Sequence, residues 1–92
     1  MDIYAQIAEK IIREQQTLIG PIAVEQAGKV PGLRVSLKND QVVIEGNKKD
    51  VLEKLVKQYE KLFGLTSVEV CRDAVKNIIS QAPQDQIPKM LL

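Results

Sequence analysis

The sequence predicts an α+β fold in which two helix–turn–helix units are joined by an antiparallel β-hairpin, in the order α-α-β-β-α-α. Apolar residues recur at helical spacing over residues 2–19 and 47–63. Between them, residues 33–46 alternate apolar and polar side chains, as a half-buried hairpin does. Residues 7–28 also align without gaps with residues 51–72, as an internal duplication would produce.

The first unit begins with an amphipathic helix over residues 2–19. Asp2 stands at its start, where an N-cap residue is favoured. Gly20 and Pro21 then end the helix, because a residue before proline avoids helical geometry and proline suits the first turn of a new helix. We therefore expect a second, short helix over residues 21–29.

A β-hairpin is expected over residues 33–46, with Asn39 and Asp40 as a two-residue turn, since both residue types tolerate a positive φ. This turn sets a register in which one face of the hairpin is wholly apolar. The cross-strand pairs that follow are Leu37 with Val42, Val35 with Ile44, Leu33 with Gly46, Ser36 with Val43 and, as an ion pair, Arg34 with Glu45.

The second unit begins with a helix over residues 47–63. Asn47 can serve as its N-cap, and Gly64 fits the left-handed αL position that often ends a helix. The stripe that we expect to be buried consists of Val51, Leu52, Leu55, Val56, Tyr59, Leu62 and Phe63.

A final helix is expected from Ser67 to Gln81. Thr66 and Glu69 have the spacing of a capping box, which marks a helix start. A short strand over residues 68–70 is the alternative for the beginning of this segment.

The two units share more than an apolar period. Two amphipathic helices that align by chance would match in their apolar residues, but not in both glycines and the Val-Glu pair that follows in the same frame. We therefore favour duplication, with the two units facing each other so that neither leaves its apolar stripe exposed. The identical pairs are Glu9/Glu53, Lys10/Lys54, Leu18/Leu62, Gly20/Gly64, Val24/Val68 and Glu25/Glu69.

The chain of 92 residues suits one domain. We expect residues 1–82 to form it, with repeat units 7–28 and 51–72 and the hairpin 33–46. Residues 83–92 contain two prolines and no regular period, which predicts a C-terminal tail. Because exposed apolar ends are usually engaged, this tail either folds back on its own core or docks into a partner.

Composition excludes several classes of function. The chain has no histidine, which removes His-based triads, most neutral-pH acid–base chemistry and His-rich metal sites. Its net charge of +1 provides no strong field for nucleic acid or anionic membrane. The single cysteine, Cys71, cannot form an intrachain disulfide and indicates a reducing compartment. With no membrane-spanning apolar run and no signal peptide, we expect a cytoplasmic protein.

The residues that could carry chemistry have simpler explanations. Cys71 lacks a histidine base and aligns with Ala27 in the repeat, so we expect it to be a small core residue. The acidic residues alternate with lysines as on a solvated surface, and no spacing singles out a pair. We therefore expect no enzymatic activity, no catalytic, cofactor-binding or metal-binding residue, and no cofactor. The acidic residues considered are Asp40, Glu45, Asp50, Glu53 and Asp73.

Two segments remain as candidate binding surfaces, the lysine-rich helix and the apolar tail. We expect a small non-enzymatic interaction or regulatory domain, which binds a protein partner or itself as a homodimer through helix faces and the tail. The alternative is nucleic-acid or anionic-lipid binding through the lysine-rich helix. The partner-binding candidates are Ile87, Pro88, Met90, Leu91 and Leu92, and the basic candidates are Lys48, Lys49, Lys54, Lys57 and Lys61.

Overall fold

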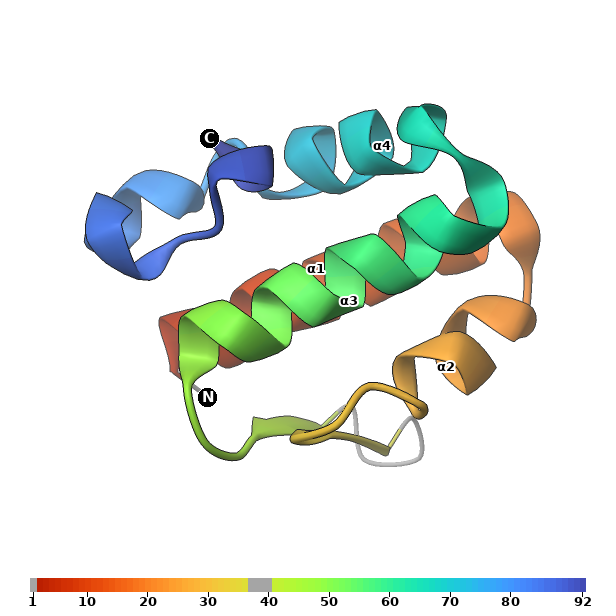
Figure 1. Cartoon of the computed structure of the whole chain (residues 1–92), viewed down its shortest axis with the longest axis horizontal. Helices are drawn as coiled ribbons and strands as arrows, with labels where there is room; N and C mark the ends of the chain where they lie inside the picture. The colour runs from red at the N-terminus through yellow and green to blue at the C-terminus, as the bar shows by residue number, and fades with distance from the viewer. Residues whose placement is uncertain (1, 37–40) are drawn as a thin grey trace.

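Helices precede and follow a β-hairpin in the computed structural model, which describes residues 2–36 and 41–92 (Figure 1). The α+β class and the order α-α-β-β-α-α are therefore confirmed. In chain order the elements are α1 (Ile3–Ile19), α2 (Ile22–Ala27), β1 (Leu33–Ser36), β2 (Gln41–Ile44), α3 (Lys48–Phe63) and α4 (Leu65–Val75), followed by the 3₁₀ turns η2 (Ile79–Gln81), η3 (Gln84–Gln86) and η4 (Lys89–Leu91).

Both long helices begin at the predicted N-cap residues. The Asp2 carboxylate accepts a hydrogen bond from the Ala5 N–H at 2.8 Å, and the Asn47 side chain accepts one from the Asp50 N–H at 2.9 Å. Each bond satisfies a backbone donor that has no partner within the helix. The Lys48 ammonium lies 3.1 Å from the other oxygen of Asp2, so the starts of α1 and α3 are connected.

Gly20 and Gly64 end these helices with nearly the same backbone geometry. Gly20 has φ 74° and ψ −154°, and Gly64 has φ 80° and ψ −169°, a region open almost exclusively to glycine. The predicted positive φ at Gly64 is confirmed, but its ψ is extended, so the residue is not in the αL conformation. Each glycine N–H donates to the carbonyl four residues earlier, Gln16 or Glu60, at 2.8 Å.

The start of α4 differs from the prediction of a helix over residues 67–81. The helix begins at Leu65, directly after the glycine, and no side chain caps it. Thr66 and Glu69 therefore lie inside the helix, and the predicted capping box is wrong. The alternative of a strand over residues 68–70 is also wrong, because these residues are helical.

Both short helices end earlier than predicted, α2 at Ala27 and α4 at Val75. Tighter bonds that span three residues follow them. The Lys29 N–H donates to the Gln26 carbonyl at 3.1 Å, and the Ile78 N–H donates to the Val75 carbonyl at 2.9 Å. After each turn the chain folds back toward the core, which a continued helix could not do.

The hairpin register differs from the prediction by two residues. Leu33 lies opposite Ile44, where Gly46 was predicted. Val35 lies opposite Val42, where Ile44 was predicted. A shift of two residues leaves every side chain on its original face, so the predicted apolar face is retained against the core. The predicted turn at residues 39–40 and the pairing of residue 37 lie outside the described residues.

The residues next to the paired strands are in close contact in this register. The Glu45 N–H donates to the Gly32 carbonyl at 2.7 Å. A Cβ at Gly32, where φ is +84°, would lie 2.7 Å from the Glu45 carbonyl oxygen and 2.9 Å from Cγ2 of Val51 on α3. Arg34 accordingly faces Val43, yet its Nε still lies 2.8 Å from Oε1 of Glu45, so the predicted ion pair is present.

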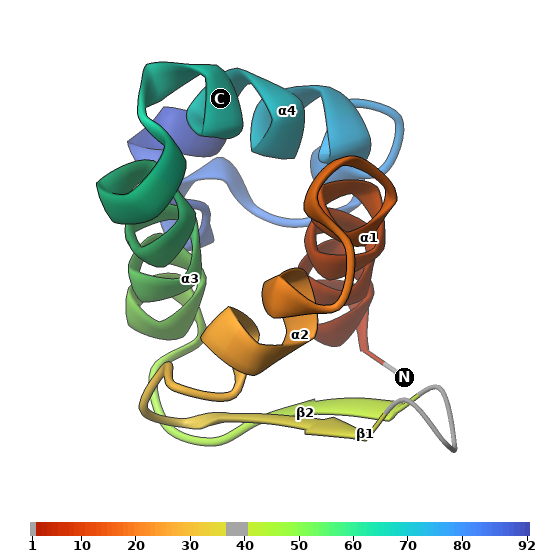
Figure 2. The same ribbon diagram turned by 90° about the vertical axis from the view of Figure 1, so that its right-hand side faces the viewer.

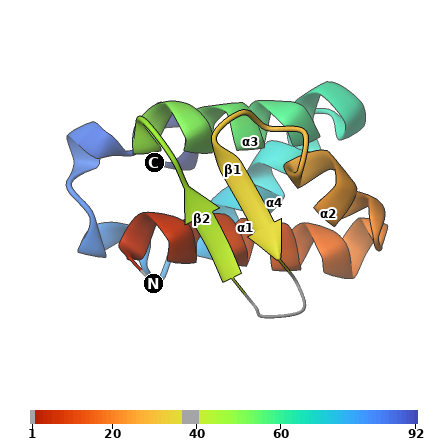
Figure 3. The same ribbon diagram turned by 90° about the horizontal axis from the view of Figure 1, so that it is seen from below.

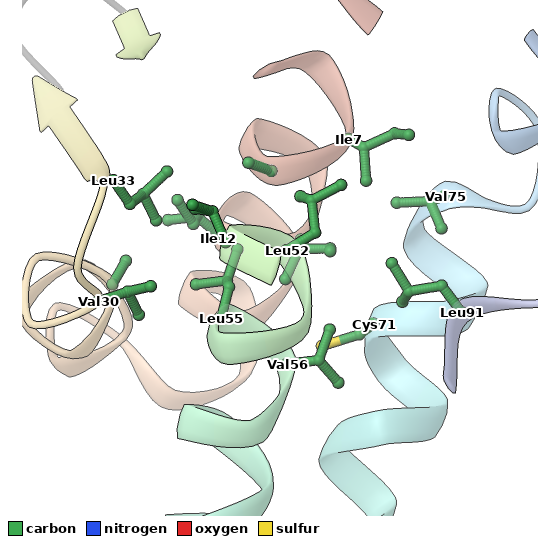
Figure 4. Close-up of a cluster of buried hydrophobic side chains, with 14 of the residues drawn as sticks. Ile7, Ile12, Val30, Leu33, Leu52, Leu55, Val56, Cys71, Val75 and Leu91 are labelled. Carbon is green, nitrogen blue, oxygen red and sulfur yellow. The ribbon is translucent and has the colours of Figure 1, made fainter. Parts of the chain in front are cut away.

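The core lies between the helices and the hairpin. In Figure 2, α1 and α3 stand on opposite sides, α4 packs across both, and α2 lies between them toward the hairpin. Figure 3 shows the hairpin from below, where β2 packs against α1. The interior is mainly aliphatic, with Tyr59 as its largest buried side chain, and draws on every layer. Figure 4 labels Ile7, Ile12, Val30, Leu33, Leu52, Leu55, Val56, Cys71, Val75 and Leu91 among its residues.

The last ten residues, expected to be a tail beyond a domain of residues 1–82, pack against the other elements. η4 contacts α4, and the Arg72 Nε donates to the Met90 carbonyl at 3.3 Å. Ile87 and Leu91 are 1% and 2% exposed and belong to the same hydrophobic core as α1 and α3. Residues 83–92 therefore complete the core that the helices leave open.

Candidate functional site

Large apolar side chains are exposed around the α1–α2 and α3–α4 connections. Both connections lie at the end of the molecule that faces the viewer in Figure 2. Leu18 and Leu65 are 60% and 67% exposed, and Ile22, Leu62 and Phe63 are 38–45% exposed. We call these residues the apolar end. The prediction that Leu62 and Phe63 belong to the buried stripe is wrong, because the stripe continues past the point where neighbouring helices cover it.

Buried hydrogen bonds cross between the two units beneath the apolar end. The Gln15 side-chain amide donates to the Ser67 carbonyl at 3.1 Å, and the Tyr59 hydroxyl donates to the Ala23 carbonyl at 2.6 Å. Each long helix thereby holds the first turn of the other unit's short helix. These bonds fix the two glycine turns relative to each other, so the apolar end has a defined shape.

The crossing bonds involve equivalent positions of the aligned segments. Gln15 aligns with Tyr59, and Ala23 aligns with Ser67. Gly20 and Gly64 are also aligned positions, and both have a positive φ. These equivalences support the internal duplication, which stays a proposal.

The apolar tail residues do not form an exposed surface. Ile87, Pro88 and Leu91 are buried in the chain's own core, and Met90 is half-buried. Leu92 is 51% exposed. Of the two alternatives for this segment, the structure shows the one in which it folds back, so a partner would find little of it accessible.

The predicted basic residues divide among three places. Lys48 is paired with Asp2 beside α1. Lys49 lies near Lys89, in a hollow that also contains acidic side chains. A different hollow is lined by Lys54, Lys57 and Lys61 together with Lys29, which follows α2 and was not among the predicted residues. Lys57 lies between the two hollows and lines both.

Cys71 is fully buried in the core, as predicted. Burial raises the pKa of the Cys71 thiol to about 11, against a smaller lowering by the hydrogen bond from Gln15, whose Nε2 lies 3.3 Å from the sulfur. The thiol is therefore protonated near neutral pH and inaccessible to a substrate, which makes it a poor nucleophile.

Thiol labelling measures this burial directly. At about pH 8, we expect an aromatic disulfide reagent to modify native Cys71 at least ~100-fold more slowly than the chain unfolded in urea, because labelling must await opening of the core. The raised pKa also makes the free energy of unfolding depend on pH. The stabilisation that Cys71 contributes is complete at a pH below the pKa of the thiol in the unfolded chain, and it declines as the pH rises toward about 11. Equal labelling rates in the two states would contradict this placement.

The acidic residues weighed from the sequence are dispersed. Glu45 pairs with Arg34 and Glu53 with Lys57, whereas Asp50 and Asp73 are exposed. Asp40 lies outside the described residues. Within the described residues, no three His, Cys, Asp or Glu side chains come together as a metal site requires.

No family model, curated protein or solved structure matches this chain. Across residues 2–36 and 41–92, none of the helices has the length and apolar character needed to cross a bilayer. A functional assignment therefore depends on the surfaces described above.

Proposed function

We propose that this chain is a small non-enzymatic protein-interaction or regulatory domain that binds a second copy of itself through the apolar end. The observation that supports this proposal is the exposure of large aliphatic and aromatic side chains on a backbone held rigid by buried hydrogen bonds. Large apolar side chains exposed at one end of a protein often mark an interaction site. We also propose a cytoplasmic location, on the unpaired cysteine.

The size of the apolar end fits a weak dimer. The exposed fractions of its residues correspond to on the order of 400 Å² of apolar surface, within the range of the largest patches on monomeric proteins. A stable interface buries about 800 Å² per partner, so the apolar end would supply about half and its polar border the rest. We therefore expect a dissociation constant in roughly the micromolar range.

The charges that border the apolar end favour a second copy of this chain over a partner whose surface is uniformly acidic or uniformly basic. Lys61 directly precedes Leu62 on α3, and Glu25 lies one turn after Ile22 on α2. Both side chains are exposed. A two-fold interface brings the same surface of both copies together, and a border with both signs avoids facing like charges everywhere.

Sedimentation velocity from about 1 to about 500 μM tests the proposal. We expect a concentration-dependent dimer that Leu65→Asp or Leu18→Asp weakens at least ~10-fold, because either change places a charge in the apolar interface. Leu92→Asp is the matched control, since that leucine is also half exposed but lies outside the apolar end. A strict monomer over this range, or a dimer insensitive to both changes, would overturn the proposal.

A further inference from the structure

The hollow beside α3 concentrates positive charge from separate elements. Lys54, Lys57 and Lys61 line it from α3, and Lys29 lines it from the segment after α2. Its volume is about 240 Å³, and Val30, Pro31 and Gln58 complete the lining. The whole chain carries a net charge of only +1, so this hollow is far more basic than the average surface.

The lysines of this hollow are poorly neutralised. Among the described residues, no acidic side chain forms an ion pair with Lys29, Lys54 or Lys61. Lys57 lies 3.6 Å from Glu53, but both side chains are exposed, and such pairs contribute little. The ammonium groups therefore repel one another, and a bound anion would reduce this repulsion.

The two walls of the hollow are connected by hydrogen bonds. The Gln58 side chain on α3 donates to the Gln26 side chain on α2 at 2.7 Å. The Lys29 N–H donates to the Gln26 carbonyl at 3.1 Å, which holds Lys29 in a tight turn. Pro31 restricts the chain that follows. The lysines thus project from a backbone that is already in place before a ligand binds.

We propose that this hollow binds a compact polyphosphorylated ligand, either free or as a lipid headgroup. Lysine ammonium groups bind phosphate as point charges, and the described lining supplies four of them from two segments of the chain. A phosphomonoester carries a charge of about −1.5 to −2, so two or three of them match the lysines of the hollow. The volume is below the ~300 Å³ of the smallest drug-sized pockets, which fits a compact anion.

Nucleic acid is the less favoured ligand for the same hollow. Binding of single strands relies on aromatic side chains that stack with bases. The lining described here contains aliphatic residues, lysines and a glutamine, and no aromatic ring. A hollow of this kind recognises charge density, not the face of a base.

Calorimetric titration of the full chain with an inositol trisphosphate tests the site. We expect binding that weakens at least ~10-fold between about 50 and about 300 mM salt, because the attraction is screened. Lys54→Glu and Lys29→Glu should each weaken it at least ~10-fold. Lys10→Glu is the matched control, because Lys10 is exposed on α1 at the position aligned with Lys54 and changes the net charge equally.

Vesicles separate the two sources of the ligand. Co-sedimentation with phosphatidylcholine vesicles containing a phosphatidylinositol bisphosphate assigns the headgroup, whereas binding of free inositol phosphate alone assigns a dissolved ligand. The proposal is overturned if neither binds, if Lys10→Glu weakens binding as much as Lys54→Glu, or if a single-stranded oligonucleotide binds more tightly than either. Lys29 and Lys54, the two lysines changed in this test, belong neither to the apolar end nor to the border residues named for it, so failure here leaves self-association standing.

Discussion

Replacing Ile87 and Leu91 together by alanine is expected to remove most of the stability of the fold. Each side chain is at most 2% exposed in the common core. Truncation of a buried Leu or Ile to alanine costs about 2–5 kcal/mol, so the pair should cost about 4–10 kcal/mol. A domain of this size has a total stability of roughly 5–14 kcal/mol, and the variant should therefore be largely unfolded at 37 °C or below.

Urea unfolding followed by circular dichroism measures this loss, with Leu92→Ala as the control. Leu92 is 51% exposed in the same segment, and its truncation should change stability by less than about 1 kcal/mol. If the double variant does not fold, the single variant Leu91→Ala still gives a measurable loss in the free energy of unfolding. A double variant as stable as the parent would mean that residues 83–92 do not pack on the core.

Gly32→Ala should cost about 2–5 kcal/mol, more than the same change at Gly46. Both glycines have a similar positive φ, +84° and +88°, which an alanine adopts at a cost of about 1–2 kcal/mol. At Gly32 the added Cβ would also meet the Glu45 carbonyl oxygen at 2.7 Å and Val51 at 2.9 Å, and forced overpacking adds about 1–3 kcal/mol.

Gly46 is a close control because its φ matches and, among the described atoms, nothing lies within 4 Å of an added Cβ. The difference between the two variants in thermal or urea unfolding therefore isolates the close approach of Gly32 to Glu45 and Val51. Equal costs at both positions would show that the hairpin does not approach α3 this closely.

The apolar end shows how a correct pattern can lead to a wrong location. Leu62 continues the apolar stripe of α3, and the period indicates which face of the helix is apolar. The period does not indicate how far along that face the neighbouring elements extend. Leu18 and Leu62 occupy the same position in the two aligned segments, each two residues before a glycine. This match was the only indication in the sequence that the two turns share an exposed apolar residue.

The sequence by itself determined the features that arise from neighbouring residues. The limits of α1 and α3 follow from Asp2 and Asn47 as caps and from Gly20 and Gly64 at the ends. The apolar face of the hairpin follows from its alternation. Capping bonds, a positive φ and side-chain periodicity act within a few residues, so a local pattern is sufficient to specify them.

The tertiary structure alone decided the features that depend on residues distant in the chain. In the folded chain Gly32 lies close to Glu45 and Val51, and Ile87 is buried in the core that α1, α3 and α4 share. Lys29 joins the lysines of α3 only because α2 packs against that helix. Such contacts reflect the packing of whole elements, which no short window of sequence specifies.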